Sequence, residues 1–426
     1  MISGILMGAF ILLMLIDVPI AFALLGGSVV AMLASNKNLM PAAQSMIATV
    51  DSFALLAIPL FIAAGDLMNR GGITARLVEL SHSLVGHFRG SLAQTGVVAA
   101  LLFGGVSGSA VADTAAVGSA VIPPMIKQGY DRAFSAALIA TAGTLGMLMP
   151  TSITLVIFAL TANVSIASLL LAGLIPGVIT GLMLCVYCYI YALRKKIEFT
   201  ETFSLRRLLR AAVQAIVPAI TPGIIVTGIV GGVFTPTEAG AVAVVYAAFI
   251  GAFVYRELNF KGLLASAVHT SIITGLVMFL IFTSFAFSWV ITLERVPETF
   301  SSYLLSSNNS ALTVFLLMNL FLLAIGTFLD PTPTILITVP IFLPIAMQFG
   351  IDPTHFAIVF TINMAIAQVS PPAGTVLFTA CGLARVSMAQ VTPPLLPLMG
   401  VLLLSLMFFI MTPSLVLLLP TLIFGK

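Results

Sequence analysis

The stretch Gly104-Gly-Val-Ser-Gly-Ser-Ala-Val-Ala-Asp113 places turn-forming residues and a carboxylate inside apolar sequence. The apolar runs on either side, 92–103 and 110–126, are short for a transmembrane helix, which needs about 20 residues. A second interruption of this kind is Gly326-Thr-Phe-Leu-Asp-Pro-Thr-Pro-Thr334. We interpret both as tips of re-entrant helical hairpins, which enter a membrane, turn and leave on the same side.

Composition supports a membrane setting for these hairpins. The 426 residues are 60% hydrophobic and only 7% charged, more apolar than a soluble core of this size can hide. An all-α polytopic membrane protein is therefore expected. The net charge of +3 fits basic cytoplasmic loops, so no nucleic-acid partner is expected. The three cysteines lie in apolar runs and suggest neither a disulfide framework nor a metal site, and no cofactor is expected.

The chain divides into two halves and a short connector. The first half, 1–196, begins with a retained helix over 3–34 and contains a hairpin at about 92–126 and a helix at about 133–161, broken at Met149-Pro-Thr-Ser152. An amphipathic cytoplasmic connector is predicted over 197–213. The second half, 214–426, contains a hairpin at about 310–349 and a helix at about 354–384, broken at Ser370-Pro-Pro-Ala-Gly374. The remaining predicted helices are 53–69, 165–193, 214–232, one that runs to Tyr255, 272–293 and about 394–420, with short surface arms at 41–50, 73–87 and 259–269.

The two halves repeat with opposite orientation. An offset of 221 residues aligns the pairs Gly129/Gly350, Asp131/Asp352, Pro150/Pro371 and Thr154/Thr375. Before the second repeat the chain crosses the membrane at 3–34, 53–69, 133–161, 165–193 and 214–232, where the last helix has no partner in the first half. This number is odd, so the second half enters the membrane inverted. Inverted repeats with broken helices are typical of secondary transporters, which bind substrate near the bilayer midplane.

The positive-inside rule fits this topology. It puts the N-terminus in the cytoplasm and the C-terminus in the periplasm, with the first hairpin entering from the cytoplasm and the second from outside. The noncytoplasmic segments then hold only Lys37, Arg295 and Lys426. The cytoplasmic segments hold all the other basic residues: Arg70, Arg76, Arg89, Lys127, Arg132, Arg194, Lys195, Lys196, Arg206, Arg207, Arg210, Arg256, Lys261 and Arg385.

Four motifs resemble a known family across the whole chain. They are Ser107-Gly-Ser-Ala-Val-Ala-Asp-Thr-Ala-Ala116, Val233-Phe-Thr-Pro-Thr-Glu-Ala-Gly240, Asp330-Pro-Thr-Pro-Thr334 and Ser370-Pro-Pro-Ala-Gly374. They resemble the large, DctM-type membrane subunit of tripartite ATP-independent periplasmic (TRAP) transporters. One departure is Met149-Pro-Thr-Ser-Ile153, where the family pattern has Pro-Pro-Ser-Ile. The break keeps Pro150 and gains Thr151.

The resemblance implies a bacterial inner-membrane transporter rather than an enzyme. It implies import of an organic acid, such as a C4-dicarboxylate, sialic acid or another sugar acid, coupled to sodium ions. It also implies a scaffold with a transport domain that moves as an elevator. The implied partners are a small four-helix membrane subunit and a periplasmic substrate-binding protein. The docking surface for the latter is open, with 36–51, 294–310 and 350–353 as candidates.

The four interruptions supply the chemistry of a cation site. Helix ends inside a membrane leave carbonyls that suit sodium and N–H groups that suit a carboxylate. We expect one sodium site per hairpin and break, formed by backbone carbonyls with Ser107, Ser109, Thr332 and Ser370, and the substrate between the tips. The full set of candidate residues is Ser107, Gly108, Ser109, Asp113, Pro150, Thr151, Ser152, Gly326, Asp330, Thr332, Thr334, Ser370, Pro371, Gly374 and Thr375.

Structural interpretations of these residues stay open. Small residues also let membrane helices pack closely. Asp113 and Asp330 could each cap the second helix of its hairpin rather than bind sodium. Proton coupling through these carboxylates is a third alternative.

Two other functions fit parts of the sequence. Gly105-Val-Ser-Gly108 matches the Gly-x-Ser-Gly of rhomboid-type intramembrane serine proteases, but His82, His87, His269 and His355 all fall in predicted loops, arms or helix ends. An ion channel is the other alternative, but no stretch resembles a selectivity filter.

Overall fold

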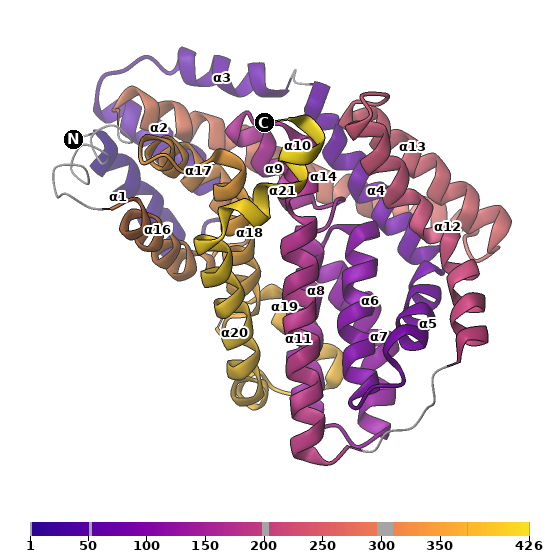
Figure 1. The fold of residues 1–426 in the computed structure, drawn as a ribbon. Helices are drawn as coiled ribbons and strands as arrows, with labels where there is room; N and C mark the ends of the chain where they lie inside the picture. Colours follow the sequence, from indigo (N-terminus) through magenta and orange to yellow (C-terminus); the bar gives the residue numbers. More distant parts are fainter. Residues whose placement is uncertain (1, 51–52, 198–203, 296–309, 373, 426) are drawn as a thin grey trace.

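The computed structural model describes residues 2–50, 53–197, 204–295, 310–372 and 374–425, and these contain helices and no strands. Figure 1 shows the helices packed side by side, with several of them roughly parallel. Seven helices in the described ranges are long and apolar enough to cross a membrane, or up to eight if the bent pair Arg132–Leu148 and Ile153–Ala162 forms one span. The all-helical membrane fold expected from composition is confirmed.

The described residues of the first half form eleven α-helices and two short 3₁₀ turns. The turns, Phe53–Leu56 and Thr144–Leu148, lead into α4 and out of α8. The α-helices are α1 (Ile2–Leu15), α2 (Ile20–Ala34), α3 (Met40–Val50), α4 (Ala57–Arg70), α5 (Ile73–Val85), α6 (Ser91–Ser107), α7 (Ala110–Lys127), α8 (Arg132–Gly143), α9 (Ile153–Ala162), α10 (Ile166–Ala172) and α11 (Leu174–Lys195).

The second half continues with longer helices. A π-helical turn, Ile250–Val254, extends α13. The α-helices are α12 (Leu205–Val230), α13 (Pro236–Phe249), α14 (Phe260–Leu293), α16 (Ala311–Gly326), α17 (Pro331–Gln348), α18 (Pro353–Val369), α19 (Thr375–Ala384), α20 (Met388–Met411) and α21 (Pro413–Phe424).

The expected single helix over 3–34 is wrong. Asp17 adopts a left-handed conformation (φ 65°), and Pro19 then stands at the start of α2. The chain reverses here, and α1 packs against α2. Phe10 of α1 also contacts Phe287 of α14, with ring centroids 5.6 Å apart. The Asp-Val-Pro interruption is thus a turn between two packed helices, and the crossing count that placed the N-terminus in the cytoplasm loses its basis.

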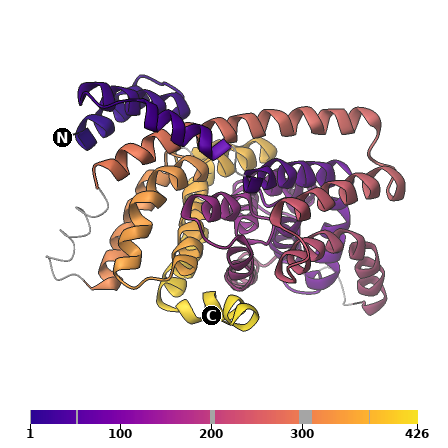
Figure 2. The ribbon, with the colours of Figure 1, turned by 90° about the horizontal axis from the view of Figure 1, so that it is seen from above.

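Three other predicted boundaries change. The arm 259–269 and helix 272–293 are one helix, α14, which Figure 2 shows running along one edge of the molecule. The connector over 197–213 and the helix from 214 are also partly one helix, because α12 begins at Leu205; residues 198–203 lie outside the described ranges. The last predicted helix, 394–420, is instead two helices that meet at Thr412. In α12 and α14 the predicted amphipathic segment and the apolar segment after it form one continuous helix.

The two halves share helix order and matching caps. Asp131 caps α8 by accepting from the N–H of Ala133 at 2.9 Å, and Asp352 caps α18 by accepting from that of Thr354 at 2.7 Å. Gly129 and Gly350, two residues before these caps, are both left-handed, with φ of 93° and 76°. All four positions match at the offset of 221 residues.

Contacts between the halves are reciprocal. In the first half α2 packs on α14 of the second half, while α13 of the second half packs on α4 of the first. Similarly, α7 packs on α19 and α17 packs on α9. In this arrangement α12, which had no expected partner, corresponds to α1, and α13 corresponds to α2. Each half then begins with a packed helix pair.

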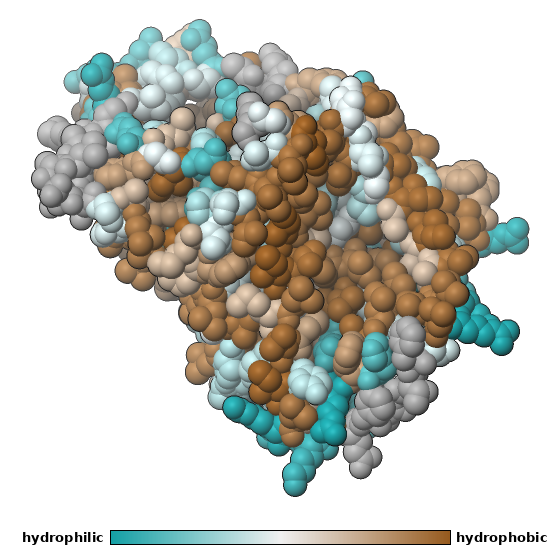
Figure 3. All heavy atoms as spheres, viewed as in Figure 1, coloured by the Kyte–Doolittle hydropathy of each residue, from teal (hydrophilic) through white to brown (hydrophobic). Residues whose placement is uncertain are grey.

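Exposed apolar side chains form an apolar belt across one face of the molecule. In Figure 3 hydrophobic residues cover the middle of the visible face, and hydrophilic residues gather at the upper left and lower right. The exposed apolar side chains include Val186 on α11, Val245 on α13 and Leu276 on α14, each 60% or more exposed. Such a belt is expected where lipid replaces water.

The helix pair α1–α2 makes a measurable distance prediction. Spin labels at Gly4 and Val30, in a background with the three native cysteines replaced by alanine, should lie less than about 20 Å apart, because packed helix axes are about 8–10 Å apart. A continuous helix would separate them by about 39 Å, at 1.5 Å per residue. Pulsed electron paramagnetic resonance measures this distance, and a value near 39 Å would contradict the pair.

Candidate functional site

The first hairpin turns through two residues. Helix α6 ends at Ser107, and Gly108 adopts a left-handed conformation (φ 64°) with its N–H donated to the carbonyl of Gly104 at 3.1 Å. Ser109 caps α7, with its hydroxyl accepting from the N–H of Ala112 at 3.5 Å. The alternative that Asp113 caps this helix is therefore wrong.

Asp113 lies fully buried behind the tip of the hairpin. Its exposed fraction is 0%, and its Oδ1 accepts a hydrogen bond from the Ser107 hydroxyl. Its Oδ2 has no hydrogen-bond partner within the described ranges, and neither has the buried hydroxyl of the next residue, Thr114. A buried charge without a partner is strongly unfavourable. The carboxylate oxygen Oδ2 is therefore suited to interact with a cation or to carry a proton.

Glycines bring backbone close to this carboxylate. A β-carbon at Gly146, in the 3₁₀ turn after α8, would lie 1.8 Å from Asp113 Oδ2. A β-carbon at Gly104 would lie 2.4 Å from the Gly146 Cα and 3.1 Å from the same carboxylate oxygen. Neither position has room for a side chain. The hairpin and the broken helix therefore meet backbone to backbone around Asp113.

Hydrogen bonds join the tip of the first hairpin to the break in the neighbouring helix. The Thr151 hydroxyl donates to the carbonyl of Gly104 at 2.8 Å, and the N–H of Ile153 donates to that of Gly108 at 3.4 Å. Ser152 caps α9, accepting from the N–H of Leu155 at 3.2 Å. Thr151, Ser152 and Pro150 are all buried. The structure thus brings the first-half candidates together: Ser107, Gly108, Ser109, Asp113, Pro150, Thr151 and Ser152.

The second hairpin meets its break through a different carboxylate contact. Asp330 stands at the N-cap position of α17, but its side chain makes no capping bond. Its Oδ1 instead accepts from the hydroxyl of Thr375, at the start of α19, at 3.2 Å. Gly326 lets α16 approach α18 closely, because a β-carbon there would lie 2.7 Å from Ala367 Cβ. Asp330 thus occupies the N-cap position of α17, as the cap interpretation predicts, but its side chain does not cap the helix.

A small cavity lies at this junction. Its volume is about 50 Å³, enough for an ion or a water molecule. Its walls include Gly326, Asp330, Gly374 and Thr375, all predicted from sequence, and also Gln368. The cavity therefore combines a carboxylate, a hydroxyl and an amide at the meeting point of hairpin and break.

The other second-half hydroxyls bond mainly to their own helices. Thr334 donates to the carbonyl of Asp330 and Ser370 to that of Ile366, each at 2.8 Å. A donating hydroxyl keeps lone pairs that can still face a cation. Thr332 lies half-buried in the first turn of α17, and Pro371 lies half-buried in the break.

Two buried asparagines were missed by sequence reasoning. Asn363 Nδ2 on α18 donates to the carbonyl of Asn319 on α16 at 2.8 Å and to its side-chain oxygen at 3.0 Å. Both residues are 2% or less exposed, and Asn363 Oδ1 has no partner within the described ranges. The available signal was an amide inside an apolar run, which is costly in a membrane unless paired or functional.

Both junctions offer oxygen atoms to a ligand. These come from carboxylates, hydroxyls and helix-end carbonyls, which hard cations prefer. Among the described residues there is no group of three or more His, Cys, Asp or Glu side chains that could hold a metal ion. Each half thus places one carboxylate beside neutral oxygens, a set of donor atoms of the kind that hard cations prefer.

Comparisons with known proteins agree on one family. The profile of the family described as "Tripartite ATP-independent periplasmic transporter, DctM component" matches residues 7–415. The C4-dicarboxylate TRAP transporter large permease protein DctM of Pseudomonas aeruginosa is 39% identical over 396 residues, 93% of each protein. The sialic acid TRAP transporter large permease protein SiaM of Vibrio cholerae is 35% identical over 414 residues, 97% of each.

A solved structure shares the fold. The crystal structure of the Alcanivorax borkumensis YdaH transporter superposes with a TM-score of 0.63 and covers 87% of both chains. Sequence identity is 15%, so this likeness concerns the fold alone.

Adjacent glycines on α6 provide a matched test of the first junction. Gly104→Ala should lower stability by about 1–3 kcal/mol, because the new methyl group meets backbone that cannot give way. Gly105→Ala is the control: nothing lies within 4 Å of its β-carbon. Alanine there should be neutral or slightly stabilising, by up to about 1 kcal/mol, through helix propensity. Thermal unfolding of the purified variants measures both, and equal melting temperatures would contradict the close contact.

Proposed function

The chain belongs to the DctM family of tripartite ATP-independent periplasmic transporters, and we propose that it is a large permease subunit that imports an organic acid, driven by sodium ions. As a member of this family it is a multi-pass inner-membrane transport protein rather than an enzyme. Relatives named for C4-dicarboxylates and for sialic acid indicate a carboxylate-bearing substrate. The unpaired, fully buried oxygen of Asp113 at the first junction is the observation that carries the sodium proposal.

The first sodium ion would bind at the first junction. Asp113 Oδ2 would supply the negative charge, and the Ser107 hydroxyl and the nearby carbonyls are further candidate ligands. Binding a cation there removes the cost of a buried carboxylate without a partner. Because Asp113 belongs to α7 and Ser107 to the end of α6, the ion would hold the two helices of the hairpin together at the tip.

The second sodium ion and the substrate would lie at and between the hairpin tips. The small cavity beside Asp330 and Thr375 is a candidate for the ion. Ser370 and Thr332 are further candidates for ligands, while Ser109, Thr151 and Thr334 lie near enough in sequence to the tips to contact substrate. N–H groups at the starts of α7 and α17 suit a substrate carboxylate.

An elevator motion is the proposed mechanism. The scaffold would contain α1–α4 and α12–α14, which pack on one another across the two halves. The moving domain would contain both hairpins and both broken helices, because direct hydrogen bonds join each tip to its break. The tripartite family implies a small membrane subunit beside the scaffold and a periplasmic binding protein that delivers substrate. An ion channel would need neither protein and would not saturate.

A sodium-site prediction follows from Asp113. Asp113→Asn should weaken sodium activation of uptake by about a hundredfold or more, because the buried ligand loses its charge. Asp17→Asn removes one carboxylate from an exposed turn between α1 and α2 and should leave activation unchanged. Uptake into proteoliposomes, measured against sodium concentration with the whole three-component system, distinguishes the two. Normal sodium activation in Asp113→Asn would refute the site.

The N-terminus is proposed to lie in the periplasm, on the same side as the C-terminus. Whether α1 and α2 cross the membrane or only enter it, the pair ends on the side where it began. The basic residues of the other loops keep their cytoplasmic placement under the positive-inside rule. An N-terminal epitope tag should therefore be removed by protease added to spheroplasts, whereas a tag in the 196–204 region should be protected. Protection of the N-terminal tag would restore the cytoplasmic assignment.

A further inference from the structure

A basic cavity lies away from both hairpin tips, where α5 meets the start of α12. Its volume is about 370 Å³, and three arginines line it: Arg206, Arg207 and Arg210. Among the described residues of its lining, Glu79 of α5 is the one acidic side chain. The cavity thus has an excess of positive charge, and the transport mechanism proposed above does not use it.

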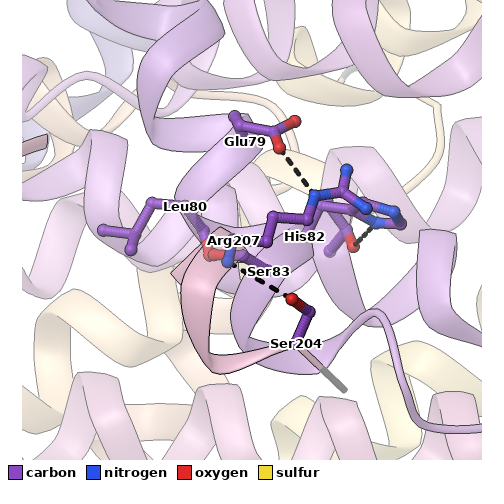
Figure 4. Close-up of polar contacts among 7 residues, drawn as sticks. Glu79, Leu80, His82, Ser83, Ser204 and Arg207 are labelled. Carbon is purple, nitrogen blue, oxygen red and sulfur yellow. Dashed lines mark hydrogen bonds and ion pairs between the residues drawn. The ribbon is translucent and has the colours of Figure 1, made fainter. Parts of the chain in front are cut away.

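Glu79 and Arg207 form an ion pair at one side of the cavity. Arg207 Nε donates to Glu79 Oε1 at 2.9 Å, and the Arg207 N–H donates to the Ser204 hydroxyl at 3.4 Å. Figure 4 shows Glu79 and Arg207 facing each other across the two helices, with Ser204 beneath. Glu79 offsets part of the positive charge on this side, while Arg206 and Arg210, both exposed, supply further positive charge to the lining.

An exposed apolar stripe runs along α12 beside these arginines. At about 100° per residue its members share one side of the helix, adjacent to the side that carries Arg206 and Arg210. Each is 40% or more exposed: Leu205, Leu209, Val213, Ile216 and Ile220. The stripe extends from the cavity toward the apolar belt, over roughly 22 Å at 1.5 Å per residue.

We propose that this cavity binds the headgroup of an anionic phospholipid, with an acyl chain along the α12 stripe. Arginine is well suited to a phosphate group because its planar donors form paired hydrogen bonds. A soluble anion would use the arginines but not the stripe, whereas a phospholipid uses both. Basic pockets beside membrane helices on the cytoplasmic side bind anionic lipids in this way. The inference rests on the proposed function only in placing α12's start at the cytoplasmic leaflet.

Such a lipid would act on the junction of α5 and α12. Helix α5 packs on both α6, the first helix of the hairpin, and α12 of the proposed scaffold. A bound headgroup would brace α12 against α5 without touching either hairpin tip. Lipid binding and sodium-driven uptake are therefore separable properties.

The test is lipid binding by the full-length purified protein. Native mass spectrometry would count dioleoyl phosphatidylglycerol molecules retained from mixed micelles, with dioleoyl phosphatidylcholine as the neutral comparison. The double variant Arg206→Gln with Arg210→Gln should bind phosphatidylglycerol roughly twenty-five-fold more weakly, since each arginine near an anionic surface contributes about a fivefold factor. The control, Lys195→Gln with Lys261→Gln, removes the same charge from exposed positions outside the cavity lining and should bind normally.

A further variant distinguishes a specific loss of lipid binding from misfolding. Glu79→Gln should tighten binding, a gain that misfolding cannot produce. Equal retention of phosphatidylcholine, an equal loss in the lysine control, or unchanged binding in the arginine variant would each overturn the proposal. Displacement of the lipid by millimolar inorganic phosphate would also overturn it, since it would identify a soluble-anion site. Because binding is measured without substrate or sodium, failure here would leave the transport proposal untouched.

Discussion

Backbone groups that leave helical pairing inside a bilayer need partners within the protein, because lipid offers none. The two hairpins and two broken helices place eight helix ends where this constraint applies. In the first half the break satisfies the tip directly: Thr151 donates to the carbonyl of Gly104, and Ile153 to that of Gly108. Each hairpin therefore depends on its neighbouring broken helix, and the rest of the fold serves to hold these pairs together.

Close backbone contact at the first junction leaves a carboxylate in an unusual position. The glycines at 104 and 146 allow the hairpin and the 3₁₀ turn to approach so closely that Asp113 is fully buried, and among the described residues only Ser107 bonds its carboxylate, at one oxygen. The packing that joins hairpin and break also leaves this carboxylate oxygen buried, which is the basis of the proposed sodium site. At the second junction the carboxylate of Asp330 is more open and is held by Thr375, so the two sites differ chemically although they match in the repeat.

The reciprocal contacts between halves explain why both junctions sit inside one protein core. α2 packs on α14 and α13 on α4, so neither half buries its own apolar faces alone. The long helix α14 contacts α2, α3, α4 and α17, and thereby connects the first half to the second hairpin. The anionic-lipid cavity proposed on α12 lies outside this core, where an arm from one half meets the first helix of the other.

Much of this protein could be deduced from its sequence because the deciding signals are local. Hydrophobicity determined that it is an all-helical membrane protein, and the Gly, Ser, Pro and Asp clusters located the four interruptions and most candidate site residues. Tertiary structure alone decided that the chain reverses at Asp17-Val-Pro19 rather than bending there. Phe10 and its neighbours pack on α14, and this packing stabilises two short helices relative to one long helix. It also decided that Ser109, not Asp113, caps α7, and that Asn319 pairs with Asn363. The reversal and the asparagine pair depend on contacts between residues tens or hundreds of positions apart, and no local sequence pattern records such contacts.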